Sequence, residues 1–591
     1  MLDPRIYRMG LVPVVLAVIV VAFSLGDQQG PVTTTLTPQV FNAASVYQAM
    51  NQLAKDYPHR VPGSDADARL AREVVVPALR ARGFSVSTDT FRGRTAGGTA
   101  TLQNVIGIRA GQQDGSIVVV ADRAALGSPA AASLSGTAVL LQLANILSGQ
   151  TLQHTIVLAS TSGAAGAAGA LRLAQTIQRP VDAVIVLGDL AGEAVREPVV
   201  VPWSDSQSVA PPVLRNTVAA VLQAQTGLSP RGAGLIGQLA HLAFPMATTE
   251  QGPFGSNDLS AVLLSVSGER GPAANEPTSQ SQIGAMGRTV LQAVGALDGA
   301  QPVPAPSTYL GFSGKTVPAW AIRLLVLALI LPVLMATIDG LARARRRGHS
   351  ILRWVAWVLA AGFPFAVAAA LVVLARVVGV IGAAPPAPVP AGAIPLYGGG
   401  IALLVVLGIT VVGGLAWLRP AVIRLIGLGS AADRRQPYGP GTAASLLLVL
   451  CVISLLVWLS NPFAAILLIP ALHLWLWIIV PDVRVPVPVV VLLLAAGLAL
   501  PVVIAIEYAS TLGIGPLQAL WSWVLLLAGG GVGVIAALEW GILAGCAISV
   551  FAIALRSAHE PGPEPIPVTI RGPVSYAGPG SLGGTESALR R

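Results

Sequence analysis

Few residues of this chain combine a side-chain type and a position suited to chemistry. Asp122 and Asp189 each come just after a short apolar, β-rich run. A carboxylate in such a place could ligate a metal ion or act as a general acid or base. Histidines, the usual partners in that chemistry, number only six in 591 residues, and both cysteines, Cys451 and Cys546, lie inside apolar runs. A cysteine-based metal site is therefore excluded from the region that holds the two aspartates.

The elements around these aspartates follow a regular alternation. Four runs are nearly continuous in apolar residues, as buried parallel strands are; they are Ser116–Val120, Thr155–Ala159, Ala183–Leu187 and Ala261–Val266. Three stretches of helical character accompany them: Ala66–Arg82, Thr137–Leu147 and Ala167–Gln178. This alternation predicts an α/β domain with a mainly parallel sheet and helices on both faces. Ligands of such sheets bind beyond the carboxyl ends of the strands, where both aspartates fall.

The order of short motifs in this region resembles that of the zinc aminopeptidases of the M28 family. The resemblance extends from about Tyr47 to Leu297, and the order and spacing of the motifs carry it rather than any single one. The matching pieces are His59–Ser64, Gly83-Phe84 at a helix end, Asn104–Gly107, Ser135-Gly136 at a helix start, Ser162-Gly163 after a strand, and Asp189–Gly192. The resemblance implies a zinc-aminopeptidase-like fold for the α/β domain.

Members of that family hold two zinc ions with histidines and carboxylates, and a glutamate acts as general base on a bridging water. Those residue types suit the metal, which lowers the pKa of its bound water toward neutrality. Where the family has His-x-Asp after the first parallel strand, this chain has Asp122-Arg123-Ala124. We expect Arg123 to pair with the adjacent Asp122. The last family histidine would fall within residues 268–279, which contain none.

The remaining family positions are also altered. The bridging aspartate falls at Ala131 or Ala132, the paired glutamates that serve as base and ligand fall on Ala164 and Ala165, and only Asp189 matches a ligand. Alanine supplies neither a lone pair nor a base. The resemblance therefore implies vestigial metal positions, with no catalytic residue, metal ion or other cofactor expected. Zinc is expected only if an unusual site has formed.

The second half of the chain is far more apolar than the first. Over the whole chain, mean hydropathy is +0.71 and only 11% of residues are charged, against about a quarter in soluble proteins. The apolar run Met9–Leu25 follows Arg5 and Arg8 and is interpreted as a retained anchor helix rather than a cleaved signal peptide. Later runs have about the 20 residues that cross a bilayer; they are Val317–Ala336, Trp354–Ile381, Gly398–Leu418, Ala443–Leu459, Pro462–Val480, Val487–Ile506 and the longer Pro516–Leu555.

Arginines between these runs alternate from loop to loop. They follow the first, third and fifth runs, at residues 343–347, 419–435 and 484, whereas the intervening loops carry no Lys or Arg. The positive-inside rule then places the N-terminus in the cytoplasm and the α/β domain outside it. The stretch Pro516–Leu555 is either two spans or a half-helix and one span; Arg556 favours the latter, which gives about eight transmembrane helices in total.

Glu539 and His473 are the ionisable candidates of the apolar runs, because Arg376 and Asp339 lie toward span ends, where their side chains can reach the interface. Glu539 is the stronger internal candidate, and His473 stands beside Trp475 and Trp477, as in an aromatic belt. A charged group in hydrocarbon is costly, so each is a functional candidate by default. A transporter-like bundle is therefore one hypothesis for this half of the chain.

The sequence divides into five segments. We expect a cytoplasmic N-terminus and anchor (1–29), an extracytoplasmic M28-like domain (30–305), a linker (306–316), a multispan all-α domain (317–556) and a disordered tail (557–591). The layout also resembles that of the peptidase-like subunit of the GPI transamidase. The net charge of +9 forms no basic face with interleaved aromatics, so no nucleic-acid partner is expected.

The leading functional hypothesis is a non-catalytic multi-pass protein of the cell membrane. Its outer domain would bind a peptide or protein partner in the old substrate cleft, and its bundle would be a scaffold in contact with the lipid bilayer. The alternatives are an active membrane-bound metallopeptidase with a non-standard zinc site, and the transporter-like component.

Overall fold

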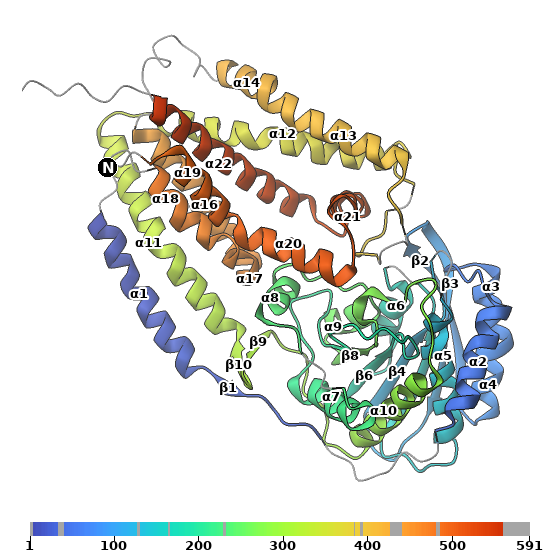
Figure 1. The fold of residues 1–591 in the computed structure, drawn as a ribbon. Coiled ribbons are helices and arrows are strands. Elements are labelled where there is room, and N and C mark those ends of the chain that lie inside the picture. Colours follow the sequence, from blue (N-terminus) through green and yellow to red (C-terminus); the bar gives the residue numbers. More distant parts are fainter. Residues whose placement is uncertain are drawn as a thin grey trace, which may run out of the picture.

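The chain forms an α/β domain beside a bundle of long apolar helices (Figure 1). The computed structural model describes residues 4–32, 41–126, 130–163, 166–228, 232–382, 384–389, 394–425, 440–479 and 485–559. Among the sequence predictions, Ala164, Ala165, the arginines at 434, 435 and 484, and the tail from residue 560 onward lie outside these ranges.

A seven-stranded mixed sheet forms the centre of the α/β domain, in the order β2-β3-β5-β4-β6-β8-β7. The four central strands are parallel; they are β5 (Thr155–Thr161), β4 (Ser116–Asp122), β6 (Ala183–Leu187) and β8 (Ala261–Leu264). These are the four strands that the sequence predicts. β7 (Val200–Val201) joins β8 in antiparallel orientation, and the hairpin of β2 (Ser85–Thr95) and β3 (Gly98–Arg109) pairs antiparallel with β5.

Helices cover both faces of this sheet, as predicted. Side chains of β4 alternate between the faces because successive residues of a strand point to opposite sides. Val119 packs into a core with four helices, which are α2 (Ala43–Asp56), α5 (Ser135–Leu147), α7 (Pro212–Thr226) and α10 (Gln280–Asp298). Its neighbours Val118 and Val120 pack against α6 (Ala168–Thr176) and α9 (Gln251–Ser256) on the opposite face.

The helical region contains seven helices long and apolar enough to cross a membrane within the described ranges, or eight if one bent pair counts as a span. The seven are α1 (Pro4–Phe23), α11 (Ala319–Arg346), α12 (Ile351–Val377), the segment Gly398–Leu425 (α13 and α14), α16 (Pro440–Ser460), α17 with α18 (Pro462–Ile479) and α22 (Val534–His559). The bent pair is α19 (Val487–Gly497) and α20 (Ala499–Leu512), with 52° between them. The predicted number of about eight is confirmed.

The stretch from Pro516 to Leu555 is a short helix followed by one span. α21 (Pro516–Gly529) has 14 residues, too few to cross hydrocarbon at 1.5 Å per residue. α14, the start of α1 and the end of α22 lie at the end of the bundle away from the α/β domain (Figure 1). Which side of the membrane each end occupies stays a prediction from the arginine pattern.

A small antiparallel sheet holds the two chain crossings between the domains together. β1 (Gly26–Asp27) pairs with β10 (Lys315–Pro318), which pairs with β9 (Tyr309–Phe312). Lys315 Nζ lies 2.5 Å from Asp27 Oδ1 across this sheet. Residues 306–316, the predicted linker, thus contain β9 and the start of β10.

Helix α8 (Leu235–Ala243) of the α/β domain packs against the bundle. Leu242 belongs to the same buried apolar cluster as Trp475 of α18. Asn461, between α16 and α17, donates its side-chain N–H groups to the carbonyl oxygens of Leu242 (2.8 Å) and Ala243 (3.0 Å). Its Oδ1 accepts from the backbone of Phe463 at 2.9 Å, so one side chain caps the end of α8 and the start of α17.

Candidate functional site

The candidate site lies at the carboxyl edge of the parallel strands. Asp122 ends β4, and its Oδ1 accepts the backbone N–H of Ala124 at 2.9 Å. Arg123, fully buried, turns away from it: its Nε lies 2.8 Å from Oδ1 of Asp67. The expected pairing of Arg123 with Asp122 is therefore wrong, because the Asp122 carboxylate folds back onto its own turn while a more deeply buried carboxylate accepts the guanidinium. Arg123 also donates to the Ser160 carbonyl at 2.9 Å.

Asp67 connects three segments that are distant in sequence. It lies in the short helix α3 (Asp65–Arg69), where its backbone N–H donates to the hydroxyl of the N-cap Ser64 at 3.2 Å. Its carboxylate accepts the hydroxyl of Ser162, after β5, at 2.5 Å. At 2% exposure it has almost no contact with solvent, so the Arg123 charge is its main compensation.

A second guanidinium lies near the same carboxylates. Arg60 is 1% exposed, donates to the Tyr57 carbonyl at 3.2 Å and contacts the hydroxyl of Ser133. Burial lowers the pKa of Arg60 to about 10, and the attraction of Asp122 and Asp67 opposes that shift. Two fixed cations at this edge repel a third, so the site disfavours a divalent metal ion.

Glu250, just before α9, completes the cluster. Its Oε2 accepts the hydroxyl of Thr161, the last residue of β5, at 2.7 Å. Burial raises the pKa of Glu250 to about 7, and burial together with the charge of Glu250 raises the pKa of Asp122 well above its usual range. No sequence motif indicated Asp67 or Glu250, because only the folded chain brings them to the edge.

The other predicted positions serve local structure. Ala131 and Ala132 form a 3₁₀ turn before α5, in which the Ala132 carbonyl accepts the hydroxyl of Ser135 at 2.5 Å. Asp189 is buried, and its Oδ1 accepts the backbone N–H groups of Ala191 (3.0 Å) and Gly192 (2.8 Å), which closes the turn after β6. Burial raises the pKa of Asp189. Ala124 is buried beside Asp122.

Two loops of the bundle cover this edge. Val389, between α12 and α13, packs on Ala96 in a small buried cluster. Pro386 of the same loop lies so close to Gly166 that a Cβ added to the glycine would stand 3.0 Å from the proline ring. Where α21 ends and the second loop, between α21 and α22, begins, the Gly529 carbonyl accepts a hydrogen bond from Nη2 of Arg94 at 2.8 Å. These two loops, the roof loops, therefore contact the β2–β3 hairpin and the turn before α6.

The residues present do not fit the dinuclear zinc centre that the family resemblance implies. Within the described ranges, no three or more His, Cys, Asp or Glu side chains gather so that they could hold a metal ion. Asp189 and Asp122 each accept backbone N–H groups of their own turns. What the arrangement can do chemically is hold buried ion pairs and share protons among carboxylates.

A second buried polar cluster lies where α8 meets the bundle. The His241 ring stacks on Trp203, with ring centroids 4.3 Å apart, and its Nε2 lies 3.4 Å from Oε2 of Glu269. Tyr508 of α20 reaches this cluster, 3.5 Å from Nδ1 of His241, and donates to the carbonyl of Phe244. Burial lowers the pKa of His241 to about 3 and raises that of Glu269 to about 8, so both are uncharged near pH 7.

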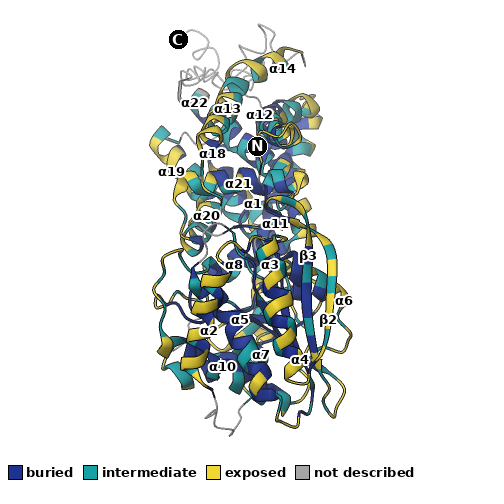
Figure 2. Ribbon diagram, turned by 90° about the vertical axis from the view of Figure 1, so that its right-hand side faces the viewer, coloured by how far each residue is buried: buried dark blue, intermediate teal, exposed yellow. Residues whose placement is uncertain are grey.

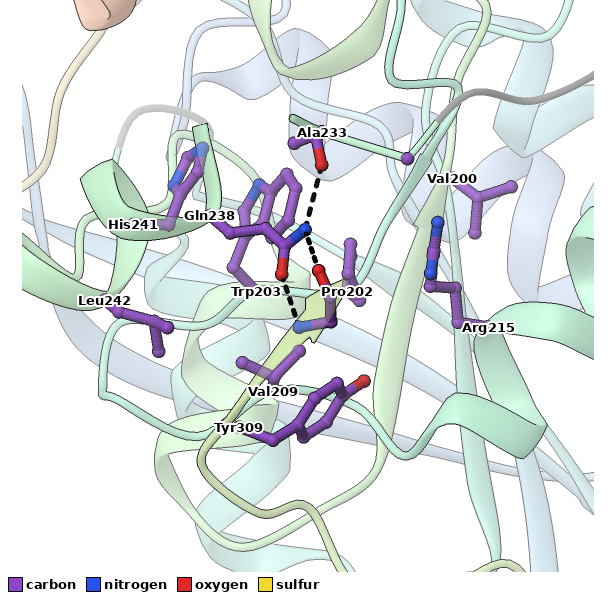
Figure 3. Close-up of a pocket in the computed structure, with 12 residues that line it drawn as sticks. Val200, Pro202, Trp203, Val209, Arg215, Ala233, Gln238, His241, Leu242 and Tyr309 are labelled. Atoms are coloured by element: carbon purple, nitrogen blue, oxygen red, sulfur yellow. Dashed lines mark hydrogen bonds between the residues drawn. The ribbon is translucent and has the colours of Figure 1, made fainter. Parts of the chain in front are cut away.

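The cavity next to this cluster is small. It measures about 30 Å³, enough for one or two water molecules. Gln238 crosses it and bonds to Gly311 of β9 through both its oxygen (2.8 Å) and its nitrogen (3.0 Å), as Figure 3 shows. Arg215 and Tyr309 line the same space (Figure 3). This region joins the domains and is too small to hold a substrate.

The two candidates of the apolar runs, His473 and Glu539, differ in environment. His473 of α18 bonds through Nδ1 to the Tyr7 hydroxyl of α1 (2.7 Å) and through Nε2 to the Leu329 carbonyl of α11 (3.0 Å). It thus ties three helices together. No hydrogen bond or ion pair links the Glu539 side chain to any residue that the structure describes. Their functional roles remain predictions.

Comparison with known proteins gives fold similarity only. No family model and no curated protein match the chain. Among solved structures, it is similar to a glutaminyl cyclase of an Acidobacteriales bacterium, with 16% identity, 46% of this chain and 99% of that chain covered, and a TM-score of 0.34. It is also similar to a Zn-dependent exopeptidase from Parabacteroides distasonis, with 14% identity, 44% of this chain and 99% of that chain covered, and a TM-score of 0.35. For the Legionella pneumophila aminopeptidase LapA the identity is 12%, 47% of this chain and 76% of that chain are covered, and the TM-score is 0.36.

Proposed function

We propose that this chain is a membrane-anchored pseudopeptidase, a binding or scaffold subunit without hydrolytic activity. The α/β domain lies outside the cytoplasm, as the arginine pattern indicates, and the bundle anchors it in the cell membrane. The partner is a peptide or protein on the same side. The layout, which resembles that of the peptidase-like subunit of the GPI transamidase, is consistent with such a role.

The main support is the buried ion pair of Arg123 and Asp67. A hydrolytic zinc centre needs neutral imidazoles, free carboxylates and an open position for water. Here a guanidinium with no exposure stands beside the end of β4, its charge opposed by Asp67 and held by backbone carbonyls. Removal of this guanidinium would leave the Asp67 carboxylate buried without a partner. The residues at this edge therefore have a structural role.

The roof over the cleft supports the same proposal. A peptidase must admit a chain terminus to the edge of its sheet, and here Pro386 and Val389 of the bundle contact the domain at Gly166 and Ala96 beside that edge, which restricts the approach. The loops are anchored in turn, because Arg94 bonds to the Gly529 carbonyl. A function that uses the assembled surface of domain and bundle fits this geometry better than turnover in the cleft.

Metal analysis of the purified full-length protein tests the absence of catalysis. After exposure to equimolar Zn²⁺ and desalting, we expect well under 0.1 zinc per chain and no release of p-nitroaniline from aminoacyl p-nitroanilides. One or two zinc ions per chain together with aminopeptidase activity would defeat the proposal, above all if Asp122→Asn or Asp189→Asn removed both.

Isolation of the intact protein in mild detergent tests the scaffold role. We expect one polypeptide to co-purify at a fixed molar ratio in two unrelated detergents, and to be lost after substitutions on the surface of the α/β domain. Elution of the chain alone in both detergents, after chemical cross-linking in the native membrane, would contradict it.

A further inference from the structure

A large cavity lies between the edge of the α/β domain and the bundle loops. It has a volume of about 590 Å³, in the range of small-molecule sites. Its walls come from β2, α6, the loop before α9 and the two roof loops. Figure 2 shows β2 as intermediate to exposed along most of its length, as expected for the outermost strand of the sheet. The cavity is separate from the buried Arg123 cluster.

Three arginines line this cavity. Arg92 and Arg94 come from β2, and Arg172 from α6. Residues two apart in a strand share a face and lie about 7 Å apart, so Arg92 and Arg94 can reach one anionic group together. Asp205 is the single acidic side chain among the described residues that line the cavity. The walls therefore carry a net positive charge.

The three arginines are not equally committed to other partners. Arg172 is paired with Asp89, with 2.7 Å between Nε and Oδ2. Arg94 uses Nη2 for the Gly529 carbonyl and keeps its other N–H groups. Arg92 is exposed, and no hydrogen bond or ion pair joins its side chain to any described residue. Arg92 and the remaining donors of Arg94 are thus available to an anion, and guanidinium groups match phosphate geometry well.

Apart from the arginines, Asp205 and Gln175, the wall is lined by apolar residues and glycines. Phe91, Leu171 and Met246 line it on the side of the α/β domain, and Pro386 and Gly530 line it on the side of the bundle. Pro386 lies between the candidate spans α12 and α13, and Gly530 lies between the short helix α21 and the candidate span α22. The cavity is therefore next to the ends of membrane-spanning helices, where lipid headgroups are expected. A ligand with one anionic head and an apolar body matches both the charge and the position.

We propose that this cavity binds the phosphate group of an anionic membrane phospholipid. Arg92 and Arg94 contact the phosphate, and the apolar residues contact the glycerol and the first part of the acyl chains. The site does not depend on whether the α/β domain is catalytic. Its failure would leave the zinc experiment unaffected, and the reverse also holds.

Native mass spectrometry of the full-length protein tests the proposal. The detergent-solubilised chain is titrated with dioleoyl phosphatidylglycerol and, separately, with dioleoyl phosphatidylcholine, whose choline cation the arginines repel. We expect phosphatidylglycerol to bind at least fivefold more tightly. The double variant R92Q/R94Q should bind phosphatidylglycerol about tenfold more weakly, as expected when charge-assisted contacts are lost.

The matched control is R80Q/R82Q. Arg80 and Arg82 are also two residues apart and exposed, but they lie in and just after α4 (Val76–Ala81), on the part of the domain far from the bundle (Figures 1 and 2). This variant should bind like the wild type. R92Q alone, which keeps the bond between Arg94 and Gly529, should weaken binding without changing the melting temperature.

Three results would overturn the proposal. One is equal binding of phosphatidylglycerol by the wild type and R92Q/R94Q, and another is an equal loss in R80Q/R82Q. The third is displacement of phosphatidylglycerol by glycerol 3-phosphate or inorganic phosphate at the concentration at which the lipid itself binds. That outcome would assign the site to a soluble anion.

Discussion

The Nε2 atom of His241 and the Oε2 atom of Glu269 lie 3.4 Å apart within the contact between α8 and the bundle. Both side chains are buried, so the environment favours the uncharged form of each. This pair therefore links the stability of the domain contact to pH.

The stability of the protein should fall between pH 7 and about 8.5. The pKa of Glu269 is about 8 in the folded state, above its usual 4.5, so the folded state keeps a proton that the unfolded state releases. The free energy of unfolding then falls as pH rises through that window. The pKa of His241 is about 3 in the folded state, below its usual 6.5. His241 therefore changes the free energy of unfolding with pH only below about pH 6.5 and not in this window.

The variant Glu269→Gln should flatten this dependence, because it cannot ionise. Melting temperatures of the wild type and the variant at pH 7.0, 7.5, 8.0 and 8.5, followed by tryptophan fluorescence, provide the measurement. Parallel curves for the two proteins would show that Glu269 does not titrate in this range.

Breaking the Arg123 ion pair should be costly. Arg123→Met leaves the carboxylate of Asp67 buried without its cation, and loss of one partner of a buried pair typically costs about 3–5 kcal/mol. The double variant Arg123→Met/Asp67→Leu should recover much of that loss, because no charge is left uncompensated. Chemical unfolding of the full-length protein measures both, with Arg80→Met as the exposed control. A double variant as unstable as Arg123→Met would contradict the prediction.

Asn461 should contribute through two separable sets of hydrogen bonds. Asn461→Ser keeps an oxygen that can cap α17 but loses the donors to Leu242 and Ala243, at a cost of about 1–3 kcal/mol. Asn461→Ala loses the cap as well, with about 0.5–2 kcal/mol more. Thermal unfolding should rank wild type, Ser and Ala in that order. Equal melting of the two variants would mean that the cap contributes nothing.

His473 and Glu539 should respond differently to neutralising substitutions. His473→Leu strands the Tyr7 hydroxyl and the Leu329 carbonyl and should cost about 1–3 kcal/mol. Glu539→Gln breaks no described contact and should stay within about 0.5 kcal/mol of the wild type. The melting temperatures of the two variants in detergent, compared with that of the wild type, measure this difference. A larger loss for Glu539→Gln would point to a partner for Glu539 in the bundle.

The parallel core of the sheet could be predicted from sequence because its strands are buried on both faces. Such strands are nearly continuous in apolar residues, and β4, β5, β6 and β8 lie where those runs are. The β2–β3 hairpin was missed. β2 mixes serine, threonine and arginine along a largely exposed edge, so it has no comparable apolar signal.

The candidate site was predicted only in part. Asp122 is the last residue of β4 and Asp189 follows the end of β6, as the order of motifs indicated. Asp67 and Glu250 were out of reach, since each joins the cluster through tertiary contacts with Ser162 and Thr161 that no local spacing encodes. The roof was equally hidden, because it depends on how the bundle docks.

The pairing of β1 with β10 has a consequence for how the protein is built. The chain leaves α1 and enters α11 at neighbouring points, so the α/β domain is an insertion into a hairpin of two adjacent helices. Insertions with nearby ends can fold as units of their own. The hairpin of α1 and α11 could then form first during synthesis, and the docking of α8 would be the late step that joins two finished halves.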